Sequence, residues 1–302
     1  MVMKKILILI LSILMLTGCE LITPEDTSPR NIYLVSVALD YKSMPKIRNL
    51  DCTLNDQAAI CDEFQYIADE CGYPLTSVVI TQNGRNYSVR LNGDAIKTET
   101  FSEATMIKED VLSWLHELAA GLDRNDLLIF HYSGHGLDGT GELVLNKKDY
   151  SKDNTRNNLV MVTSEDLYEA VKDTDGIKFF VLDSCYSGVY ADALTPVNPS
   201  SPFRDFFTLD SPNENIFVLT GSSSEERSWE KNGVYGDMTL GLLLSLGYDK
   251  ENRIPGLATD KRYYSEIVKY IQKNISSYTH DREQHPEGAA IKDFLIYSRK
   301  PQ

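Results

Sequence analysis

The sequence is poor in cysteine, in basic residues and in long apolar segments. Five of its 302 residues are cysteines, too few for the disulfide framework of a small secreted protein. Lysine and arginine number 30 against 44 aspartates and glutamates, so the chain lacks the basic surface of a general nucleic-acid binder. Beyond the N-terminal region, no apolar run approaches the roughly 18 residues of a membrane-spanning helix. These shortages exclude a disulfide scaffold, general nucleic-acid binding and a protein with several membrane spans.

The composition is otherwise that of a folded protein. Hydrophobic residues make up 42% of the chain, enough for a substantial core, which excludes wholesale disorder. The length allows one large domain or two small ones.

The N-terminus has the build of an export signal. Lys4 and Lys5 precede an apolar run over 6–16, which is too short to span a membrane comfortably. The run ends in Leu-Thr-Gly-Cys at 16–19, which resembles a bacterial lipoprotein signal. The resemblance implies cleavage before Cys19 and a lipid on its thiol; an uncleaved N-terminal anchor is the alternative.

The expected organisation follows from that signal. Residues 1–18 are predicted to be the signal peptide, and 19–30 the lipidated cysteine with a tether rich in proline and small polar residues. The protein should then be lipid-anchored to a membrane in the bacterial cell envelope, facing outside the cytoplasm.

Apolar periodicity in the rest of the chain predicts strands that alternate with helices. We expect strands over 32–39, 77–81, 127–132, 142–145, 177–182, 215–219 and 294–297, and helices over 54–71, 103–118, 164–171, 240–246 and 263–275. This alternation predicts an α/β fold with a mostly parallel sheet and helices on both faces. Two stretches, 146–160 and 190–214, are expected to be long loops.

Reactive side chains follow two of the expected strands. The strand over 127–132 leads into His-Tyr-Ser-Gly-His-Gly at 131–136, and the strand over 177–182 leads into Asp-Ser-Cys-Tyr-Ser-Gly at 183–188. Sites in open α/β sheets lie beyond the carboxyl ends of the strands. An imidazole near a thiol can remove the proton of that thiol and make it a nucleophile.

Together the two motifs resemble the caspase-like cysteine peptidases, above all the metacaspase and bacterial orthocaspase branch. The resemblance covers roughly 31–298. It implies a caspase-hemoglobinase-like fold, with about six strands in the sheet, as one peptidase domain over 31–302. It also implies that His135 is the general base, that Cys185 is the nucleophile, and that the backbone N–H groups of Gly136 and Cys185 form the oxyanion hole.

The expected substrate pocket is acidic. Caspases that cut after aspartate use two arginines, but Leu50 stands at one of these positions and the cysteine motif lacks the other. Asp183 precedes Cys185 by two residues, and Asp56 lies nearby by family analogy. Two carboxylates favour a cationic guest, and the similar metacaspases cleave after arginine or lysine.

We therefore predict a polypeptide substrate with a basic residue before the scissile bond, bound by Asp56, Ser133 and Asp183. Alternatively, Asp56 is an ordinary acid in the first turn of a helix, and Asp183 a structural hydrogen-bonding group at a strand end. Thr53 stands where the metacaspase pattern often has a cysteine, which leaves the lining of the pocket open.

Other site chemistries are less favoured. His131 and His135 have the spacing of a helical zinc pair, but the residues between them are Tyr-Ser-Gly and no glutamate follows His131. His131 is expected to be a core histidine, and no metal site is predicted. No cofactor is expected to be required. Metacaspases often need calcium, which stays open as an alternative; the acids loosely placed for it are Asp149, Glu165, Asp166 and Asp192.

The sequence thus predicts a lipid-anchored cysteine endopeptidase specific for arginine or lysine. Its expected partners are that substrate and, through the lipid, a membrane, with no nucleic acid. One rival is a relative from the same peptidase clan with another specificity, gingipain-like or legumain-like. Another is an inactive caspase-fold lipoprotein that serves as a binding or scaffold module.

Overall fold

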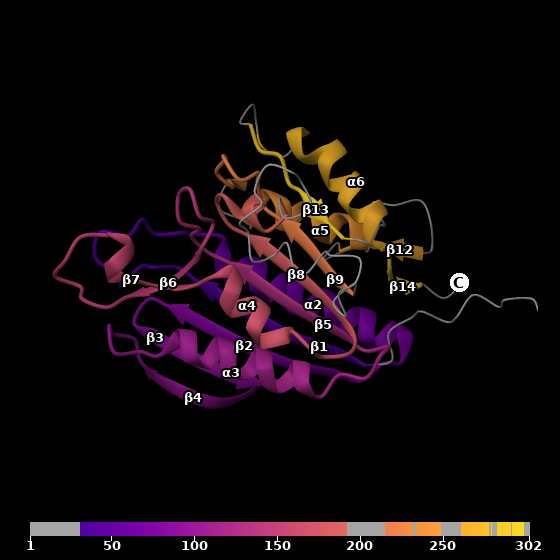
Figure 1. Ribbon diagram of the computed structural model, residues 1–302, viewed down its shortest axis with the longest axis horizontal. Helices are drawn as coiled ribbons and strands as arrows, with labels where there is room; N and C mark the ends of the chain where they lie inside the picture. Colours follow the sequence, from indigo (N-terminus) through magenta and orange to yellow (C-terminus); the bar gives the residue numbers. More distant parts are fainter. Residues whose placement is uncertain are drawn as a thin grey trace, which may run out of the picture.

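The computed structural model describes residues 31–191, 215–231, 234–248, 261–277, 279, 283–290 and 292–298. The predicted signal, Cys19 and tether lie outside these residues. The central sheet contains the strands β1 (Ile32–Leu39), β2 (Leu75–Asn83), β3 (Asn86–Leu91), β4 (Asp94–Thr100), β5 (Leu127–Ser133), β8 (Ile177–Asp183), β9 (Ile216–Thr220) and β13 (Gly288–Ala289). Their order is β13-β9-β8-β5-β1-β2-β3-β4 (Figure 1).

The middle of the sheet is parallel. Strands β9, β8, β5, β1 and β2 all run in one direction, whereas β13, β3 and β4 add antiparallel edges. The prediction of a mostly parallel sheet is confirmed. The predicted number of about six strands was too low, because the sheet has eight.

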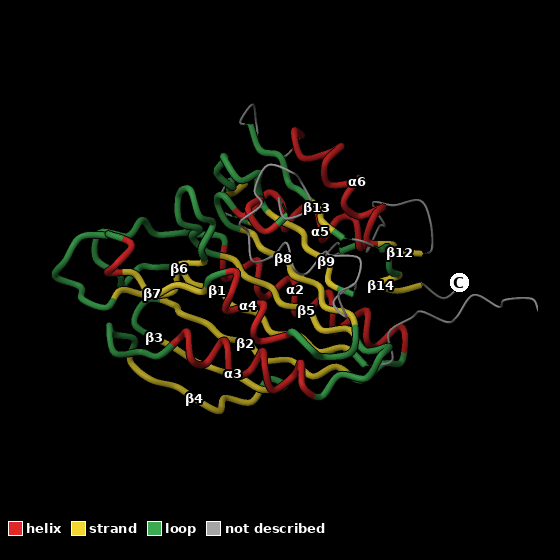
Figure 2. The backbone as a smooth tube through the Cα atoms, in the orientation of Figure 1, coloured by secondary structure: helices red, strands yellow, loops and turns green. Residues whose placement is uncertain are grey.

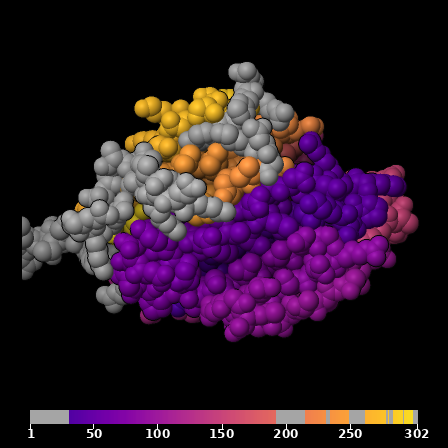
Figure 3. Space-filling view, turned by 180° about the vertical axis from the view of Figure 1, so that it is seen from behind, coloured from indigo at the N-terminus to yellow at the C-terminus, as the bar shows by residue number. Residues whose placement is uncertain are grey.

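Helices cover both faces of the sheet (Figure 2). The helices α3 (Ile107–Ala120) and α4 (Ser164–Val171) contribute to one apolar cluster. The cluster on the other face receives α2 (Thr53–Cys71), α5 (Asp237–Leu246) and α6 (Tyr264–Asn274). From behind, the N-terminal third of the chain forms much of the surface, with the orange and yellow C-terminal segments above it (Figure 3).

Local sequence explains several of these elements. β1 is buried almost throughout, as a strand covered on both faces must be. α2 ends at Gly72, which adopts the left-handed conformation that favours glycine. α4 begins with a reciprocal capping box between Thr163 and Asp166.

Smaller two-stranded sheets and short helices complete the described fold. The sheets pair β6 (Leu143–Lys147) with β7 (Leu159–Val162), β10 (Glu230–Lys231) with β11 (Tyr235–Gly236), and β12 (Lys261–Tyr263) with β14 (Leu295–Ser298). The 3-10 helices are η1 (Arg156–Asn158), η2 (Ser187–Tyr190) and η5 (Ile275–Ser277). The expected loop 146–160 therefore contains strand ends, and the expected loop 190–214 lies mostly outside the described residues. Within the described ranges, no helix is both long and apolar enough to cross a bilayer.

The sheet register positions the site. Ser133 at the end of β5 pairs with Asp183 at the end of β8, and the N–H of Gly134 donates to the carbonyl of Asp183 at 3.3 Å. The chain therefore leaves both strands at the same level of the sheet edge, and the residues that follow, His135 and Cys185, emerge side by side.

A core substitution tests this packing. Phe64 in α2 is fully buried in the cluster shared with α5 and α6, so Phe64→Ala should lower the free energy of unfolding by about 3–5 kcal/mol. Asp62→Ala, at an exposed position of the same helix, should change it by less than about 0.5 kcal/mol. Urea denaturation followed by circular dichroism measures both; equal stabilities would contradict the described burial.

Candidate functional site

His135 and Cys185 both line a pocket of about 140 Å³. The Cys185 thiol lies 3.8 Å from the carbonyl oxygen of Ser228, to which it donates. The chain turns sharply after the cysteine, because Tyr186 has a φ of 59° and its N–H donates to the carbonyl of Glu226 at 2.7 Å. The turn places the thiol at the sheet edge beside the loop over 221–230.

The imidazole of His135 has a defined orientation. Its Nε2 lies 2.7 Å from the carbonyl oxygen of Arg48. A carbonyl only accepts hydrogen bonds, so Nε2 carries the proton and Nδ1 has the free lone pair. The ring packs against Tyr41 at a centroid distance of 4.5 Å, and the Tyr41 hydroxyl accepts the N–H of His135 at 2.9 Å. Nδ1 is therefore the atom that can accept a proton.

Burial keeps both reactive groups neutral. It lowers the pKa of His135 below its usual value and raises the pKa of the Cys185 thiol, because a partly desolvated site disfavours charge. At neutral pH the free site accordingly holds a thiol and a neutral imidazole, so that His135 can act as a base.

The backbone of Gly136 lies close to that of the cysteine. It forms an antiparallel bridge with Leu143, in which the residues on either side of Gly136 make the hydrogen bonds. Its own N–H is thus not used in that bridge. A Cβ at this position would overlap the carbonyl of Cys185, so only glycine permits the approach. The backbones of Gly136 and Cys185, the two residues predicted to form the oxyanion hole, are therefore in close contact.

The structure also brings together the three residues predicted for the substrate pocket. Asp56 from α2, Ser133 from β5 and Asp183 from β8 line the same pocket as His135 and Cys185. The Ser133 hydroxyl donates to Asp56 at 2.8 Å. Gly236 lies between the two carboxylates, where a Cβ would overlap Asp183 and crowd Asp56.

Within the described part of the chain, only neutral groups are hydrogen-bonded to these carboxylates. Asp56 accepts from Ser133 and from the N–H of Gly236 at 2.9 Å. Asp183 accepts from the Ser228 hydroxyl at 2.7 Å, and from the N–H and hydroxyl of Thr239 at 3.0 and 2.7 Å. No lysine or arginine in the described ranges forms an ion pair with either.

Burial and the nearness of the two carboxylates shift their pKa values. Burial, and then the charge of Asp183, raise the pKa of Asp56, and burial raises the pKa of Asp183. Asp56 lies in the first turn of α2 but does not cap the helix: its hydrogen bonds go to Ser133 and Gly236. Thr53, which stands where the metacaspase pattern often has a cysteine, also contributes to the lining of the pocket.

Sequence reasoning missed a third carboxylate in this pocket. Glu230 contributes to the lining and accepts from the N–H groups of Cys52 at 3.3 Å and Asp51 at 3.5 Å. Burial raises its pKa. Its neighbour Trp229 lines the pocket too. In the sequence, Glu230 is marked only by its position directly after Trp229.

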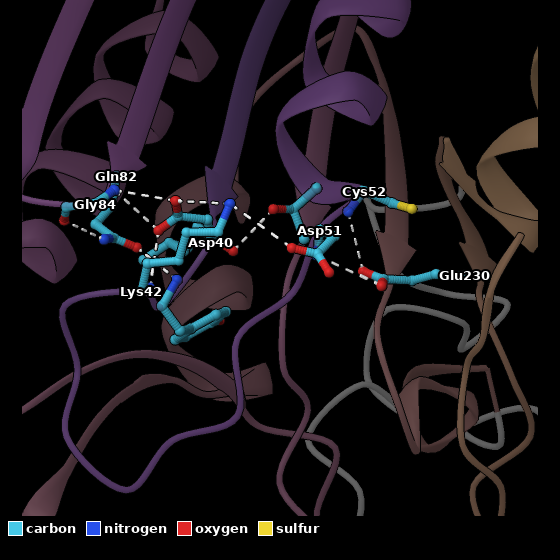
Figure 4. A network of polar contacts seen from close by, with 10 residues as sticks. Asp40, Lys42, Asp51, Cys52, Gln82, Gly84 and Glu230 are labelled. Carbon is cyan, nitrogen blue, oxygen red and sulfur yellow. Dashed lines mark hydrogen bonds and ion pairs between the residues drawn. The ribbon is translucent and has the colours of Figure 1, made fainter. Parts of the chain in front are cut away.

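Polar contacts anchor the segment that connects β1 with α2 (Figure 4). The buried carboxylate of Asp40 accepts the N–H groups of Lys42 and Gly84, each at 3.0 Å. The Lys42 ammonium lies 3.8 Å from Asp40 and 3.7 Å from Asp51. The N–H of Asp51 in turn donates to Glu230, which lines the acidic pocket. The network therefore connects the acidic pocket with the segment whose Arg48 carbonyl faces His135.

His131 lies inside the sheet. It is fully buried, and its Nδ1 is 2.9 Å from the Ser36 hydroxyl. Burial lowers its pKa to about 3, which keeps it neutral. It is a core histidine, as expected, and it is not among the residues that line the pocket with His135.

The three described acids considered for calcium, Asp149, Glu165 and Asp166, do not form a metal-binding group. Asp149 pairs with Lys152 at 3.0 Å, and Asp166 with Lys108 at 2.6 Å. Asp192 lies outside the described residues. Where the chain is described, no group of three or more histidine, cysteine, aspartate or glutamate side chains is placed to hold a metal ion.

Comparisons with known proteins identify the family and the fold. A family model described as metacaspase, peptidase C14 domain, matches residues 35–194. A second, described as a prokaryotic membrane lipoprotein lipid attachment site, matches residues 3–19. No curated protein matches the chain.

A solved structure shows the fold. The crystal structure of caspase-1 from Spodoptera frugiperda superposes with a TM-score of 0.51 at 11% sequence identity, over 91% of this chain and 92% of that chain. The fold is therefore caspase-like. With more than half of its length matched by the family model, the chain belongs to the metacaspase peptidase C14 family of cysteine-type peptidases and carries a lipoprotein attachment site.

Proposed function

We propose that this lipoprotein is an endopeptidase that uses Cys185 and His135 and cleaves after arginine or lysine. The observation that carries the proposal is the pair of buried carboxylates, Asp56 and Asp183, which share a pocket with the thiol and imidazole and are bonded to neutral donors alone. With its lipid on Cys19, the enzyme would act in the bacterial cell envelope, outside the cytoplasm.

The geometry supports a two-step acyl transfer. The thiol proton passes to Nδ1 of His135 as sulfur attacks the scissile carbonyl, and the N–H groups of Gly136 and Cys185 stabilise the oxyanion. The peptide C–N bond then breaks, and the proton on His135 goes to the leaving amine. Water, deprotonated by His135, hydrolyses the thioester and releases the acid and the thiol. The Arg48 carbonyl would hold the imidazole in the productive tautomer throughout.

The preference for a basic side chain rests on charge. Buried carboxylates without a cation are costly, and an arginine or lysine side chain of the substrate would supply the missing charge. Arginine matches planar carboxylates by paired hydrogen bonds. Glu230 adds a third carboxylate to the walls.

The first prediction concerns the nucleophile and the base. Cys185→Ala and His135→Ala should each reduce hydrolysis of fluorogenic arginine and lysine peptides by roughly a thousandfold or more, because each removes a partner in proton transfer and acylation. Peptides with aspartate or asparagine in the same position, with and without calcium, complete the assay. Turnover of aspartate peptides alone would rule out the basic preference, and no turnover of any peptide would favour the scaffold function.

The second prediction concerns the pocket charge. Asp183→Asn should lower kcat/KM for an arginine peptide by about a hundredfold, and Glu230→Gln by about tenfold, since each removes one charge facing the guanidinium. The ratio of kcat/KM for the arginine peptide to kcat/KM for a neutral citrulline peptide reports the effect of charge separately from any effect on folding. Glu165→Gln, an exposed carboxylate outside this pocket, is the matched control. An unchanged ratio in Asp183→Asn would contradict the assignment.

The third prediction is a pH dependence of KM. Because burial raises the pKa values of Asp56 and Asp183 above 3.8, these groups take up protons at a higher pH than ordinary aspartates do, and the pocket loses negative charge as the pH falls. KM for an arginine peptide should therefore rise on acidification, approaching about tenfold per pH unit below the raised pKa. Steady-state kinetics from about pH 8 to pH 5 measure this. In Asp183→Asn the dependence should be weaker; a flat wild-type KM would contradict the raised pKa values.

A further inference from the structure

A second hollow adjoins the reactive groups. Its volume is about 340 Å³, and four of its lining residues, Arg48, His135, Cys185 and Arg227, also line the acidic pocket. The thiol and the imidazole therefore lie where the two hollows meet. A peptide held at the thiol has access to both.

The walls of the second hollow differ in character from those of the acidic pocket. Its apolar members are Ile47, Leu137, Val144 and Leu159. Its charged side chains are Arg48, Arg227 and Asp138, all exposed. The hollow thus combines an apolar wall with two guanidinium groups and a single carboxylate, whereas in the first pocket three carboxylates outnumber the same two guanidinium groups.

We propose that this hollow binds the residue on the leaving side of the scissile bond, and that it selects a large apolar side chain there. The proposal rests on the proposed function, which assigns the acidic pocket to the residue on the acyl side. When the C–N bond breaks, His135 gives its proton to the leaving amine, so the leaving residue must lie against His135. The second hollow begins at that side chain and at Gly136.

Charge adds a second selection. Two guanidinium groups against one carboxylate disfavour a lysine or arginine on the leaving side. The acyl side favours these same residues. The two hollows would therefore orient a peptide across the thiol, with the basic residue on one side of the cleaved bond and the apolar residue on the other.

The segment between β1 and α2 provides a matched pair of variants. Ile47 and Leu50 lie three residues apart, but Ile47 lines the second hollow and Leu50 the acidic pocket. Ile47→Ala should enlarge only the leaving side, and Leu50→Ala only the acyl side. Leu137→Ala is a second variant on the leaving side, in case Ile47→Ala does not fold.

The experiment uses internally quenched peptides with a fixed acyl-side residue and leucine, phenylalanine, alanine or lysine on the leaving side. Wild type should show a kcat/KM about tenfold higher for leucine than for alanine, and lower still for lysine, because a buried apolar side chain gives discrimination of this order. Ile47→Ala should reduce the leucine-to-alanine ratio to about threefold, and Leu50→Ala should leave it unchanged. Deacylation of a matching ester should be the same in wild type and Ile47→Ala, because the leaving residue has by then departed.

The outcomes separate this proposal from the proposed function. The acyl-side residue is the one that the enzyme turns over fastest among arginine, lysine, aspartate and asparagine peptides. A wrong assignment of arginine or lysine would therefore appear in that assay and would not affect the comparison of leaving-side residues. A wild type without preference for leucine, or an unchanged ratio in both Ile47→Ala and Leu137→Ala, overturns the leaving-side assignment. Absence of turnover of every peptide overturns both proposals.

Discussion

The rest of the site depends on two buried carboxylates that have no partner of opposite charge among the described residues. Asp56 and Asp183 lie on either side of Gly236, and hydroxyl and N–H donors satisfy their oxygens. These hydrogen bonds reduce the cost of desolvation but do not neutralise charge. The fold holds this arrangement because one acid stands on a helix and the other on a strand, both fixed by the core. Under the proposed function, such a pocket is prepared for a cation before any substrate arrives.

Much of the sheet could be predicted because buried parallel strands are continuous apolar runs. The bounds of β1 agree with the expected 32–39, and α4 agrees with the expected 164–171. The hairpin of β3 and β4 was missed, since much of it is polar and exposed. Its signal was the pair Asn92-Gly93, both with positive φ, at a two-residue turn typical of hairpins. β14 was expected as a strand, but periodicity does not identify a partner, and it pairs with β12 outside the central sheet.

The part of the site that lies at the ends of strands could be predicted from the sequence. Ser133 and Asp183 are brought together by the register of β5 and β8, a consequence of parallel pairing. By contrast, the hydrogen bond from His135 to the Arg48 carbonyl has no sequence signature, because every residue has a carbonyl. The role of Glu230 depends on how β10 lies against the start of α2, which local patterns do not specify.

One segment links His135 to both hollows. Between β1 and α2, the chain gives the Arg48 carbonyl to His135, Ile47 to the second hollow and Leu50 to the acidic pocket. The buried ammonium of Lys147 donates to the carbonyl of Pro45 at 3.2 Å and so ties this segment to the end of β6. Because the carbonyl fixes the tautomer of His135, a shift of the segment would alter proton transfer and the shape of both hollows together. Under the proposals above, the same stretch of backbone therefore sets both the specificity and the tautomer of His135.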